Sequence, residues 1–507
     1  MSSRSPKRLS QLLSGCEVEF KTGPDPMVCG VEHDSRRICP GDVFVCLRGQ
    51  RHDGHRFVPQ AVDKGAVAVV SERRLDLPSD VALVVVPDSR RALAWLAAAV
   101  HDHPSKGMRL IGVTGTNGKS TTVHLVRTIL ERTGRPCGLV GTVHRVVGGT
   151  VLPADLTTPE APELQRLLAG MLEAGCSHAV MEVSSQALAV GRVATCEFDV
   201  AVFTNLTYEH MELHGTFDEY RKAKGLLFQH LGTTYWGSSK DGPKAAVLNA
   251  DDPSFPHFRS WCAVPVVAYG LGDGCQVRGT EVKTDDRGRV TFRVNAHGHS
   301  ALVRLRLAGT FNVYNALAAL AVALVEGLQL EEAVEALEYA DPVPGRFEYV
   351  DAGQPFAVIV DYAHSPNGLE NVLQAARGLA RGRVLVVFGC GGDRDPSKRP
   401  IMGEIAGALA DLVVVTSDNP RHEDPHQIMA DIEEGLKRTP PREGYRLVED
   451  RREAIRTAIR LAREGDVVLI AGKGHETTQI YGDRALPFDD RRVAREVLAE
   501  VVRGKRE

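Results

Sequence analysis

Short apolar runs, separated by stretches with helical periodicity, recur along this chain, and no other feature constrains its fold as strongly. Such runs occupy residues 110–113, 179–183, 200–203, 357–360, 384–388, 412–415 and 467–470. Buried strands that alternate with helices are typical of parallel sheets covered by helices on both faces. The sequence therefore predicts an α/β fold in which most strands are parallel.

The pattern divides the chain into three regions, which we expect to be domains spanning residues 1–105, 106–340 and 341–507. The first predicts a small α/β domain, and the third predicts a doubly wound α/β domain. Within the second, residues 276–308 change to a period of two, which predicts antiparallel hairpins with turns at 285–288 and 296–298. A length of 507 residues also agrees with three domains of roughly 150 residues each.

The composition is that of an ordinary globular protein. Hydrophobic residues make up 43% and charged residues 25%, and the net charge of -4 gives no general attraction to nucleic acid or anionic membranes. No apolar run approaches the roughly 18 residues needed to span a bilayer, and no signal peptide follows the basic N-terminus. The 10 cysteines form no CxxC pair, which indicates reduced thiols. We expect a monomeric, cytoplasmic protein that binds small molecules, with no nucleic-acid partner and no membrane insertion.

Unusual polar residues follow the apolar runs of the second and third regions. These clusters are 115–120, Glu182, Asn205, Asp361, 389–394, 418–421 and 472–476. In open parallel sheets, ligands bind in the crevice beyond the carboxyl ends of the strands. Two sheets that face each other across such a crevice predict an enzyme with substrates between its domains.

Residues 112–121 read Gly-Val-Thr-Gly-Thr-Asn-Gly-Lys-Ser-Thr, between a predicted strand and a predicted helix. Glycines let backbone amides surround phosphate, Lys119 can reach the β- and γ-phosphates, and Ser120 can bind Mg²⁺. Val113 stands where a standard loop has its first glycine, with Gly112 and Gly115 on either side. The ATP-binding candidates here are Thr114, Gly115, Thr116, Asn117, Gly118, Lys119 and Ser120.

Three further residues are ambiguous when each is taken alone. Glu182 ends a predicted strand, where a carboxylate either binds Mg²⁺ or is solvated. His210 is either a metal ligand or a structural residue. By composition alone, Lys224 would be a solvated lysine on a helix.

The motifs taken together resemble the Mur ligases, the ATP-dependent amino-acid ligases of peptidoglycan precursor synthesis. The resemblance rests on residues 114–120, 182–185, 205–214, 311–316 and 361–364. In the first region, residues 33–36 and 49–54 resemble the UDP-binding domain of one branch of this family. Folylpolyglutamate synthetases share the ATP loop but lack that domain.

The resemblance implies three domains that hold UDP-sugar, ATP and the incoming amino acid in that order. It implies that CO₂ carbamylates Lys224, and that the carbamate, Ser120, Glu182 and His210 organise two Mg²⁺ ions beside Lys119. Ser35 is expected near the uridine. The remaining candidates are Thr157, Thr158, Ser184 and Arg192 for the muramoyl dipeptide, and Asn315, Arg346 and Asp361 for ATP.

Specificity is expected to reside in the third region. Two arginines at strand ends would, by themselves, be compatible with surface ion pairs. By resemblance, however, the Asp-Asn-Pro-Arg sequence at 418–421 marks the branch that adds meso-2,6-diaminopimelate, whose distal carboxylate suits a bidentate guanidinium. The expected amino-acid site consists of Arg394, Asp418, Asn419, Pro420, Arg421, Gly472 and Glu476.

The expected reaction is amide formation through an acyl phosphate. Two alternatives remain at this level. The same reaction with L-lysine or L-ornithine is one, and a P-loop NTPase switch without ligase activity is the other.

Overall fold

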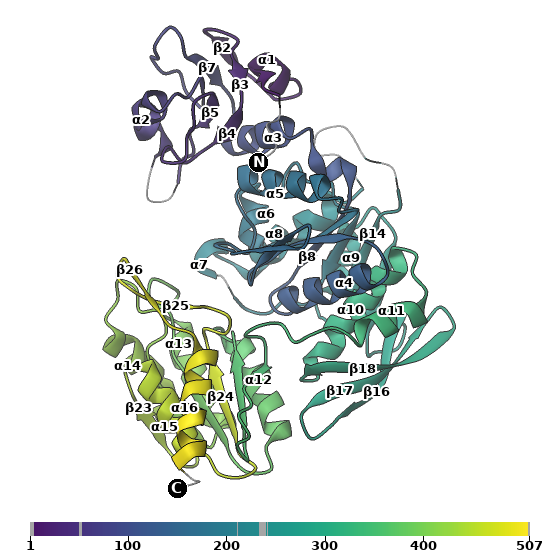
Figure 1. Cartoon of the computed structure of the whole chain (residues 1–507), viewed down its shortest axis with the longest axis vertical. Helices are drawn as coiled ribbons and strands as arrows, with labels where there is room; N and C mark the ends of the chain where they lie inside the picture. Colours follow the sequence, from purple (N-terminus) through teal and green to yellow (C-terminus); the bar gives the residue numbers. More distant parts are fainter. Residues whose placement is uncertain (1–4, 50–52, 210, 233–239, 241, 505–507) are drawn as a thin grey trace.

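The computed structural model describes residues 5–49, 53–209, 211–232, 240 and 242–504. It consists of an N-terminal, a central and a C-terminal part, each built on its own main sheet (Figure 1). Helices lie against these sheets, and most strand pairs within them are parallel. The α/β fold class predicted from the alternating apolar runs is therefore confirmed.

The N-terminal domain has a five-stranded sheet in the order β2-β7-β6-β5-β4. Its strands are β2 Phe20–Thr22, β4 Gly30–Glu32, β5 Asp42–Val45, β6 Ala68–Ser71 and β7 Ala82–Val85. Helices α1 Leu9–Leu12, α2 Val58–Asp63 and α3 Ser89–Val100 surround it, and β1 Lys7–Arg8 pairs with β3 Met27–Val28. Only β2 runs antiparallel to its neighbour within this sheet.

The central domain has an eleven-stranded sheet in the order β11-β10-β9-β12-β8-β13-β14-β15-β16-β17-β18. The strands of its parallel part are β8 Arg109–Thr114, β9 Cys137–Val140, β12 His178–Glu182, β13 Val200–Phe203, β14 Ala245–Asn249, β15 Val266–Gly270 and β16 Val277–Thr284. The two predicted hairpins are confirmed as β16, β17 Arg289–Ala296 and β18 His299–Ala308. The sequence patterns did not predict the hairpin of β10 Arg145–Val147 and β11 Thr150–Leu152 at the opposite edge.

Helices cover both faces of the central sheet because successive strand residues point to opposite sides. Ile111 and Val113 of β8 pack in a core with α4 Lys119–Arg132, α10 Phe311–Val325 and α11 Leu330–Leu337. Leu110 points into the other core, which includes α5 Ala161–Glu173, α8 Phe217–Gln229 and α9 Phe255–Trp261. The short helices α6 Ser185–Ala189 and α7 Met211–His214 complete this domain.

The C-terminal sheet has the order β19-β20-β24-β21-β22-β23 and is parallel except for β19. Its strands are β19 Glu348–Tyr349, β20 Ala357–Asp361, β21 Val384–Phe388, β22 Leu412–Val415, β23 Tyr445–Leu447 and β24 Val467–Ala471. One face carries α12 Pro366–Leu379, α13 Lys398–Leu409 and α14 Pro425–Arg438, and the other carries α15 Arg451–Leu461 and α16 Asp490–Gly504. A small hairpin, β25 Thr478–Tyr481 with β26 Arg484–Pro487, follows β24.

Two helices of this domain begin at a capping side chain that is followed by proline. The Ser365 side chain accepts a hydrogen bond from the Gly368 amide at the start of α12, and the Asp424 carboxylate accepts one from the His426 amide at the start of α14. Proline occupies the first position of each helix, where its missing N–H costs nothing. Among the described residues, every helix is too short or too polar to cross a lipid bilayer.

Candidate active site

The loop between β8 and α4 is pressed against the end of β13 and against α10. Gly115 has φ +149° and Gly118 has φ +85°. A Cβ atom on Gly115 would lie 1.9 Å from Thr204 Oγ1, and one on Gly118 would lie 2.4 Å from Asn315 Oδ1. Glycine is required at both positions because neither the space nor the backbone conformation admits a side chain.

Asn205, after β13, fixes the course of this loop. The Thr116 amide donates to the Asn205 carbonyl at 2.8 Å, and the Asn117 amide donates to Asn205 Oδ1 at 2.9 Å. Thr204 Oγ1 donates to the Asn117 carbonyl at 2.6 Å. The sequence patterns placed Asn205 after a strand but did not select it as a site residue, since its role depends on the neighbouring strand.

Two lysines converge on one carbonyl of the loop. Lys119 Nζ donates to the Gly115 carbonyl at 2.9 Å, and Lys224 Nζ, from α8, donates to the same oxygen at 2.8 Å. Burial lowers the pKa of both amines, and the nearby Lys119 charge lowers that of Lys224 further. This geometry concentrates positive charge where a phosphate would lie and favours the neutral amine of Lys224.

Glu182, at the carboxyl end of β12, lies beside the loop. Its Oε2 accepts a hydrogen bond from Ser120 Oγ at 3.0 Å. Thr142 donates its amide to Glu182 Oε1 at 2.7 Å and its hydroxyl to Oε2 at 3.1 Å. The buried pair of Ser120 and Glu182 provides the hard oxygen donors that Mg²⁺ prefers. His210, the other predicted metal ligand, lies outside the described residues.

The candidate dipeptide residues form a continuous group next to Glu182. Thr158 Oγ1 donates to the Glu182 carbonyl at 2.8 Å and accepts from the Ser184 amide at 3.0 Å. Arg192 donates to the Thr158 carbonyl at 3.1 Å. Thr157 Oγ1 lies 3.0 Å from Thr142 Oγ1, within hydrogen-bond distance. The structure thus brings all four candidates to the metal-binding side of the loop.

Two of the candidates, Arg192 for the dipeptide and Ser35 for the uridine, already have partners within the protein. The Arg192 guanidinium already lies 2.7 Å from Glu160 Oε1, so a substrate anion would share it with that carboxylate. Ser35 belongs to the N-terminal domain, where its buried hydroxyl donates to Gln60 Oε1 at 2.7 Å. It lies in a turn after β4, in a different domain from the other candidates, as a residue for the distal end of a long substrate would.

A cavity of about 710 Å³ opens between the loop, α10 and the start of α12. Five ATP candidates line it, namely Asn117, Gly118, Asn315, Arg346 and Asp361. Arg346 donates to Ser120 Oγ at 2.9 Å, so a residue of the C-terminal part reaches the phosphate loop. Asp361 accepts amide hydrogen bonds from Phe347 and Ala363, and burial raises its pKa to about 6.

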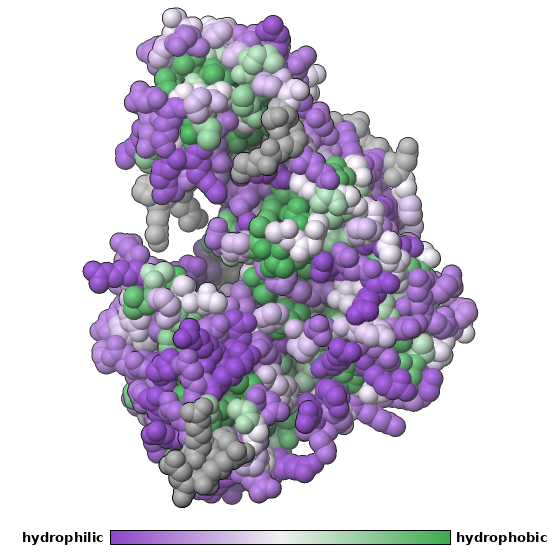
Figure 2. Space-filling view, viewed as in Figure 1, coloured by the Kyte–Doolittle hydropathy of each residue, from purple (hydrophilic) through white to green (hydrophobic). Residues whose placement is uncertain are grey.

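Other contacts also join the central and C-terminal domains at this place. Asn117 Nδ2 donates to Asn367 Oδ1 at 2.9 Å, and His364 Nε2 lies 3.6 Å from Glu209 Oε1. Figure 2 shows a hollow between the N-terminal and C-terminal domains. The phosphate loop therefore lies where two domains meet and where a long substrate has access from the third.

The amino-acid candidates meet at the carboxyl ends of β21, β22 and β24. Arg421, with φ +53°, donates to the Gly392 carbonyl at 2.7 Å. A Cβ on Gly392 would lie 1.9 Å from the Pro420 carbonyl, and one on Gly472 would lie 2.5 Å from Asp418 Oδ2. The three loops are thus in direct contact.

The charges in this pocket are opposed and close together. Burial, followed by repulsion from Arg394, lowers the pKa of Arg421. Asp418 is 7% exposed, and its Oδ2 has no hydrogen-bond partner among the described residues. Asn419 Nδ2 donates to Glu476 Oε2 at 2.9 Å. A ligand with both an ammonium and a carboxylate matches such a pocket.

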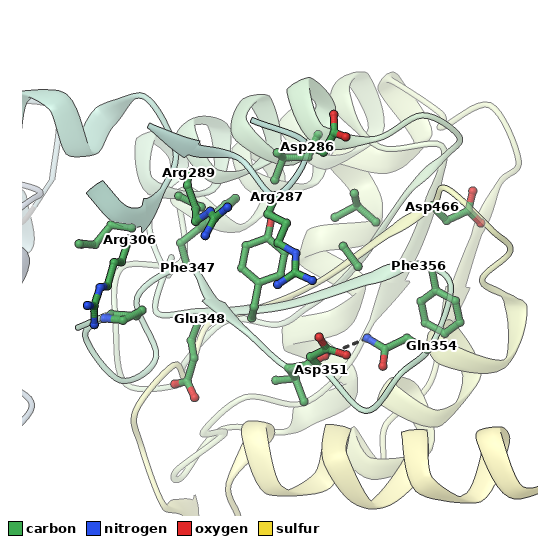
Figure 3. Close-up of a pocket in the computed structure, with 18 of the residues that line it drawn as sticks. Asp286, Arg287, Arg289, Arg306, Phe347, Glu348, Asp351, Gln354, Phe356 and Asp466 are labelled. Atoms are coloured by element: carbon green, nitrogen blue, oxygen red, sulfur yellow. Dashed lines mark hydrogen bonds between the residues drawn. The ribbon is translucent and has the colours of Figure 1, made fainter. Parts of the chain in front are cut away.

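A second cavity, of about 720 Å³, lies elsewhere between the β17–β18 hairpin and the C-terminal domain (Figure 3). Arg287, Arg289 and Arg306 line one side of it. Of the predicted site residues only Arg346 reaches it. The groups that suit phosphoryl and acyl transfer therefore belong to the first cavity and its surroundings.

Comparison with known proteins agrees with this geometry. The Mur ligase family, catalytic domain, matches residues 28–101; the Mur ligase middle domain matches 113–323; and the Mur ligase, glutamate ligase domain, matches 345–474. A protein of Geobacillus kaustophilus is 50% identical over 478 residues, which are 94% of this chain and 96% of that protein. The chain belongs to the Mur ligase family.

The relatives of this Mur ligase have specific names. The Geobacillus kaustophilus protein is named UDP-N-acetylmuramoyl-L-alanyl-D-glutamate--2,6-diaminopimelate ligase. A protein of Syntrophomonas wolfei with the same name is 47% identical over 98% of this chain and 99% of its own length. A solved structure of that ligase is 31% identical, with a TM-score of 0.67 over 97% of this chain and 99% of the other. MurF from Thermotoga maritima in complex with ADP, 21% identical with a TM-score of 0.62 over 93% and 96%, shares the fold.

Two residues of this Mur ligase were missed by sequence reasoning. Thr142 holds Glu182, and Lys473 is a fully buried lysine beneath the amino-acid pocket. Thr142 lies after β9 in an ordinary sequence context, so no local signal marks it. Lys473 stands between two glycines of the 472–476 segment, and its position inside a polar cluster was the available signal.

Proposed function

We propose that this Mur ligase joins meso-2,6-diaminopimelate to the D-glutamyl residue of UDP-N-acetylmuramoyl-L-alanyl-D-glutamate in peptidoglycan precursor synthesis, with ATP converted to ADP and phosphate. The observation that carries the proposal is the contact of the three loops at the carboxyl ends of β21, β22 and β24, where the charges of Arg394, Asp418 and Glu476 act on Arg421. The distal end of diaminopimelate has one ammonium and one carboxylate, whereas lysine has only the ammonium. The names of relatives that are up to 50% identical over nearly the whole chain support the same substrates.

The chemistry has two steps. A carboxylate oxygen of the glutamyl residue attacks the γ-phosphorus of ATP, the bond to the β,γ-bridging oxygen breaks, and ADP leaves behind an acyl phosphate. The amine nitrogen of diaminopimelate then attacks the acyl carbon, the amine loses a proton, and phosphate departs from the tetrahedral intermediate. Positioning and electrostatic stabilisation account for most of the catalysis of phosphoryl transfer.

The residues act from the positions described above. The amides of the loop and Lys119 hold the β- and γ-phosphates, while Asn315, Arg346 and Asp361 surround the rest of the nucleotide. Thr157, Thr158, Ser184 and Arg192 orient the glutamyl end of the substrate, and Ser35 lies toward the uridine. Because these groups are preorganised by hydrogen bonds within the protein, little reorganisation is needed when charge develops.

Mg²⁺, bound as two ions, would neutralise the charge that spreads over the transferring phosphoryl group. Ser120 and Glu182 supply oxygen donors for it, and His210 is proposed as a further ligand. We further propose that the neutral amine of Lys224 attacks CO₂, forms an N–C bond and loses a proton. The resulting carbamate would replace a cation with an anionic oxygen donor, and the lowered pKa of Lys224 favours the neutral amine that this reaction needs.

We propose that the enzyme acts as a monomer in the cytoplasm. The ten cysteines are all free, which suits a reducing compartment.

The test is an amino-acid panel assayed by phosphate release. Purified enzyme is given ATP, Mg²⁺ and the UDP-dipeptide together with meso-diaminopimelate, L-lysine or L-ornithine, and each mixture is repeated without the UDP-dipeptide. We expect release with diaminopimelate that depends on both organic substrates. Equal use of lysine would overturn the specificity, and equal hydrolysis without either organic substrate would indicate an NTPase switch.

A further inference from the structure

Lys473 is buried beneath the amino-acid pocket, with 0% of its surface exposed. It follows β24 and belongs to the 472–476 loop. Its Nζ donates to Asn419 Oδ1 at 2.9 Å and to Glu476 Oε2 at 2.8 Å. A buried ammonium is costly unless it is paired and hydrogen-bonded, so these two contacts account for its presence inside the fold.

The three residues form a closed unit. Asn419 Nδ2 donates to the same Glu476 Oε2 at 2.9 Å, and Asn419 Oδ1 also accepts the Ile480 amide at 3.0 Å. Glu476 Oε2 thus receives two donors from within the protein. Its other oxygen, Oε1, accepts no hydrogen bond from the described residues, so this oxygen remains for a ligand.

The charge of Lys473 changes what the pocket can bind. Asp418 and Glu476 provide two carboxylates, and Arg394 and Arg421 provide two guanidinium groups. Asp393 is a third carboxylate that acts on Arg421, so Lys473 brings these charges into balance, and without it the carboxylates would exceed the cations. An excess of negative charge would favour a substrate end that has an ammonium alone over one that also has a carboxylate, and Lys473 prevents that excess.

We propose that Lys473 is a positioning and specificity-determining residue. It fixes Asn419 and Glu476 as one unit that presents Glu476 Oε1 to the distal ammonium, and it disfavours amino acids without a distal carboxylate. It touches neither the substrate nor the reacting atoms. This inference rests on the proposed function, since it concerns the same amino-acid pocket.

The first test is the Lys473→Met variant, which keeps the length of the side chain and removes its charge. We expect the KM for meso-diaminopimelate to rise about tenfold or more, because two charge-assisted hydrogen bonds are lost. The ratio of kcat/KM for diaminopimelate to that for L-lysine should fall by a similar factor. The KM values for ATP and the UDP-dipeptide should stay within about twofold.

Lys240→Met is the matched control. Lys240 is also a largely buried lysine paired with a carboxylate, Asp199, at 2.6 Å, and it donates to two backbone carbonyls far from the amino-acid loops. Its loss should lower the thermal midpoint without changing the substrate ratio. If Lys473→Met lowers activity toward diaminopimelate and lysine in equal proportion, as a merely structural lysine would, the inference is wrong.

A double variant keeps the test decisive if Lys473→Met does not fold. Lys473→Met combined with Glu476→Gln removes both members of the buried ion pair, so no unpaired carboxylate remains. Because Lys473 positions Glu476, the double variant should raise the KM for diaminopimelate about as much as Glu476→Gln alone. A clear further rise of this KM in the double variant would contradict the inference. Failure of the parent enzyme to use diaminopimelate would instead contradict the proposed function.

Discussion

The phosphate loop of the central domain and the amino-acid pocket of the C-terminal domain occupy the same kind of place, the carboxyl ends of parallel strands, but they are built differently. The loop is one continuous segment whose course is set by Gly115, Gly118 and backbone amides. The pocket combines side chains from three loops over a buried lysine. A site made of consecutive residues can be recognised in the sequence, whereas one assembled from distant loops needs the fold.

The largest effect is expected from Lys119→Ala, because this side chain meets the charge that develops on the phosphoryl group. Turnover of ATP should fall on the order of 10³-fold, with binding of the UDP-dipeptide largely unchanged. Phosphate release and calorimetric binding measure the two quantities. Lys222→Ala, which removes an exposed lysine paired with Glu219 on α8, is the control and should be nearly neutral. If Lys119→Ala retained ligase activity, the assignment of this loop to the phosphates of ATP would be wrong, and its comparison with the amino-acid pocket would no longer hold.

Lys224→Ala should lower activity by about 10² to 10³-fold if a carbamate at this position binds Mg²⁺. Added short-chain carboxylic acid should restore part of the activity, because it supplies an oxygen donor where the carbamate would lie. The assay is a titration of phosphate release with the acid, with Lys222→Ala treated in parallel. Absence of rescue at any concentration would leave Lys224 as a simple cation beside Lys119.

Arg421→Ala tests the other region. We expect kcat/KM for diaminopimelate to fall about 10²-fold, since the distal carboxylate of the substrate would lose its guanidinium partner. The KM for ATP should remain within about twofold, because the variant leaves the phosphate loop intact. Arg438→Ala, at an exposed ion pair with Glu404, is the control. If the variant raised the KM for ATP as much as the KM for diaminopimelate, the pocket and the loop would not be separate sites.

The smallest effect is expected from Asn367→Ala, which removes the acceptor of the Asn117 side chain across the domain junction. A neutral hydrogen bond contributes about 1 kcal/mol, which corresponds to roughly a fivefold rise in the KM for ATP. Gln427→Ala, at an exposed position of α14 outside this cavity, gives the baseline. An unchanged KM for ATP would show that this junction contributes nothing to nucleotide binding.

The parts of the fold that were predicted have short-range causes. The hairpin turns at 285–288 and 296–298 depend on a few adjacent residues. The hairpin of β10 and β11 was missed because its strands have three residues each, too few to show a period of two. Of the candidate site residues, those in the phosphate loop follow from a local motif. The position after an apolar run marked Glu182, Asp361 and the clusters at 389–394, 418–421 and 472–476, and the remaining candidates entered through the family resemblance.

The sequence by itself determined the α/β architecture, the phosphate loop and the family. Apolar runs and glycine-rich turns consist of consecutive residues, so they can be identified without the tertiary structure. Only the tertiary structure decided which side chains face one another. It placed Lys224 on the same carbonyl as Lys119, Thr142 on Glu182, and Lys473 beneath Asn419 and Glu476. These contacts join residues on separate strands and helices, and their energies depend on burial and distance, which no local pattern specifies.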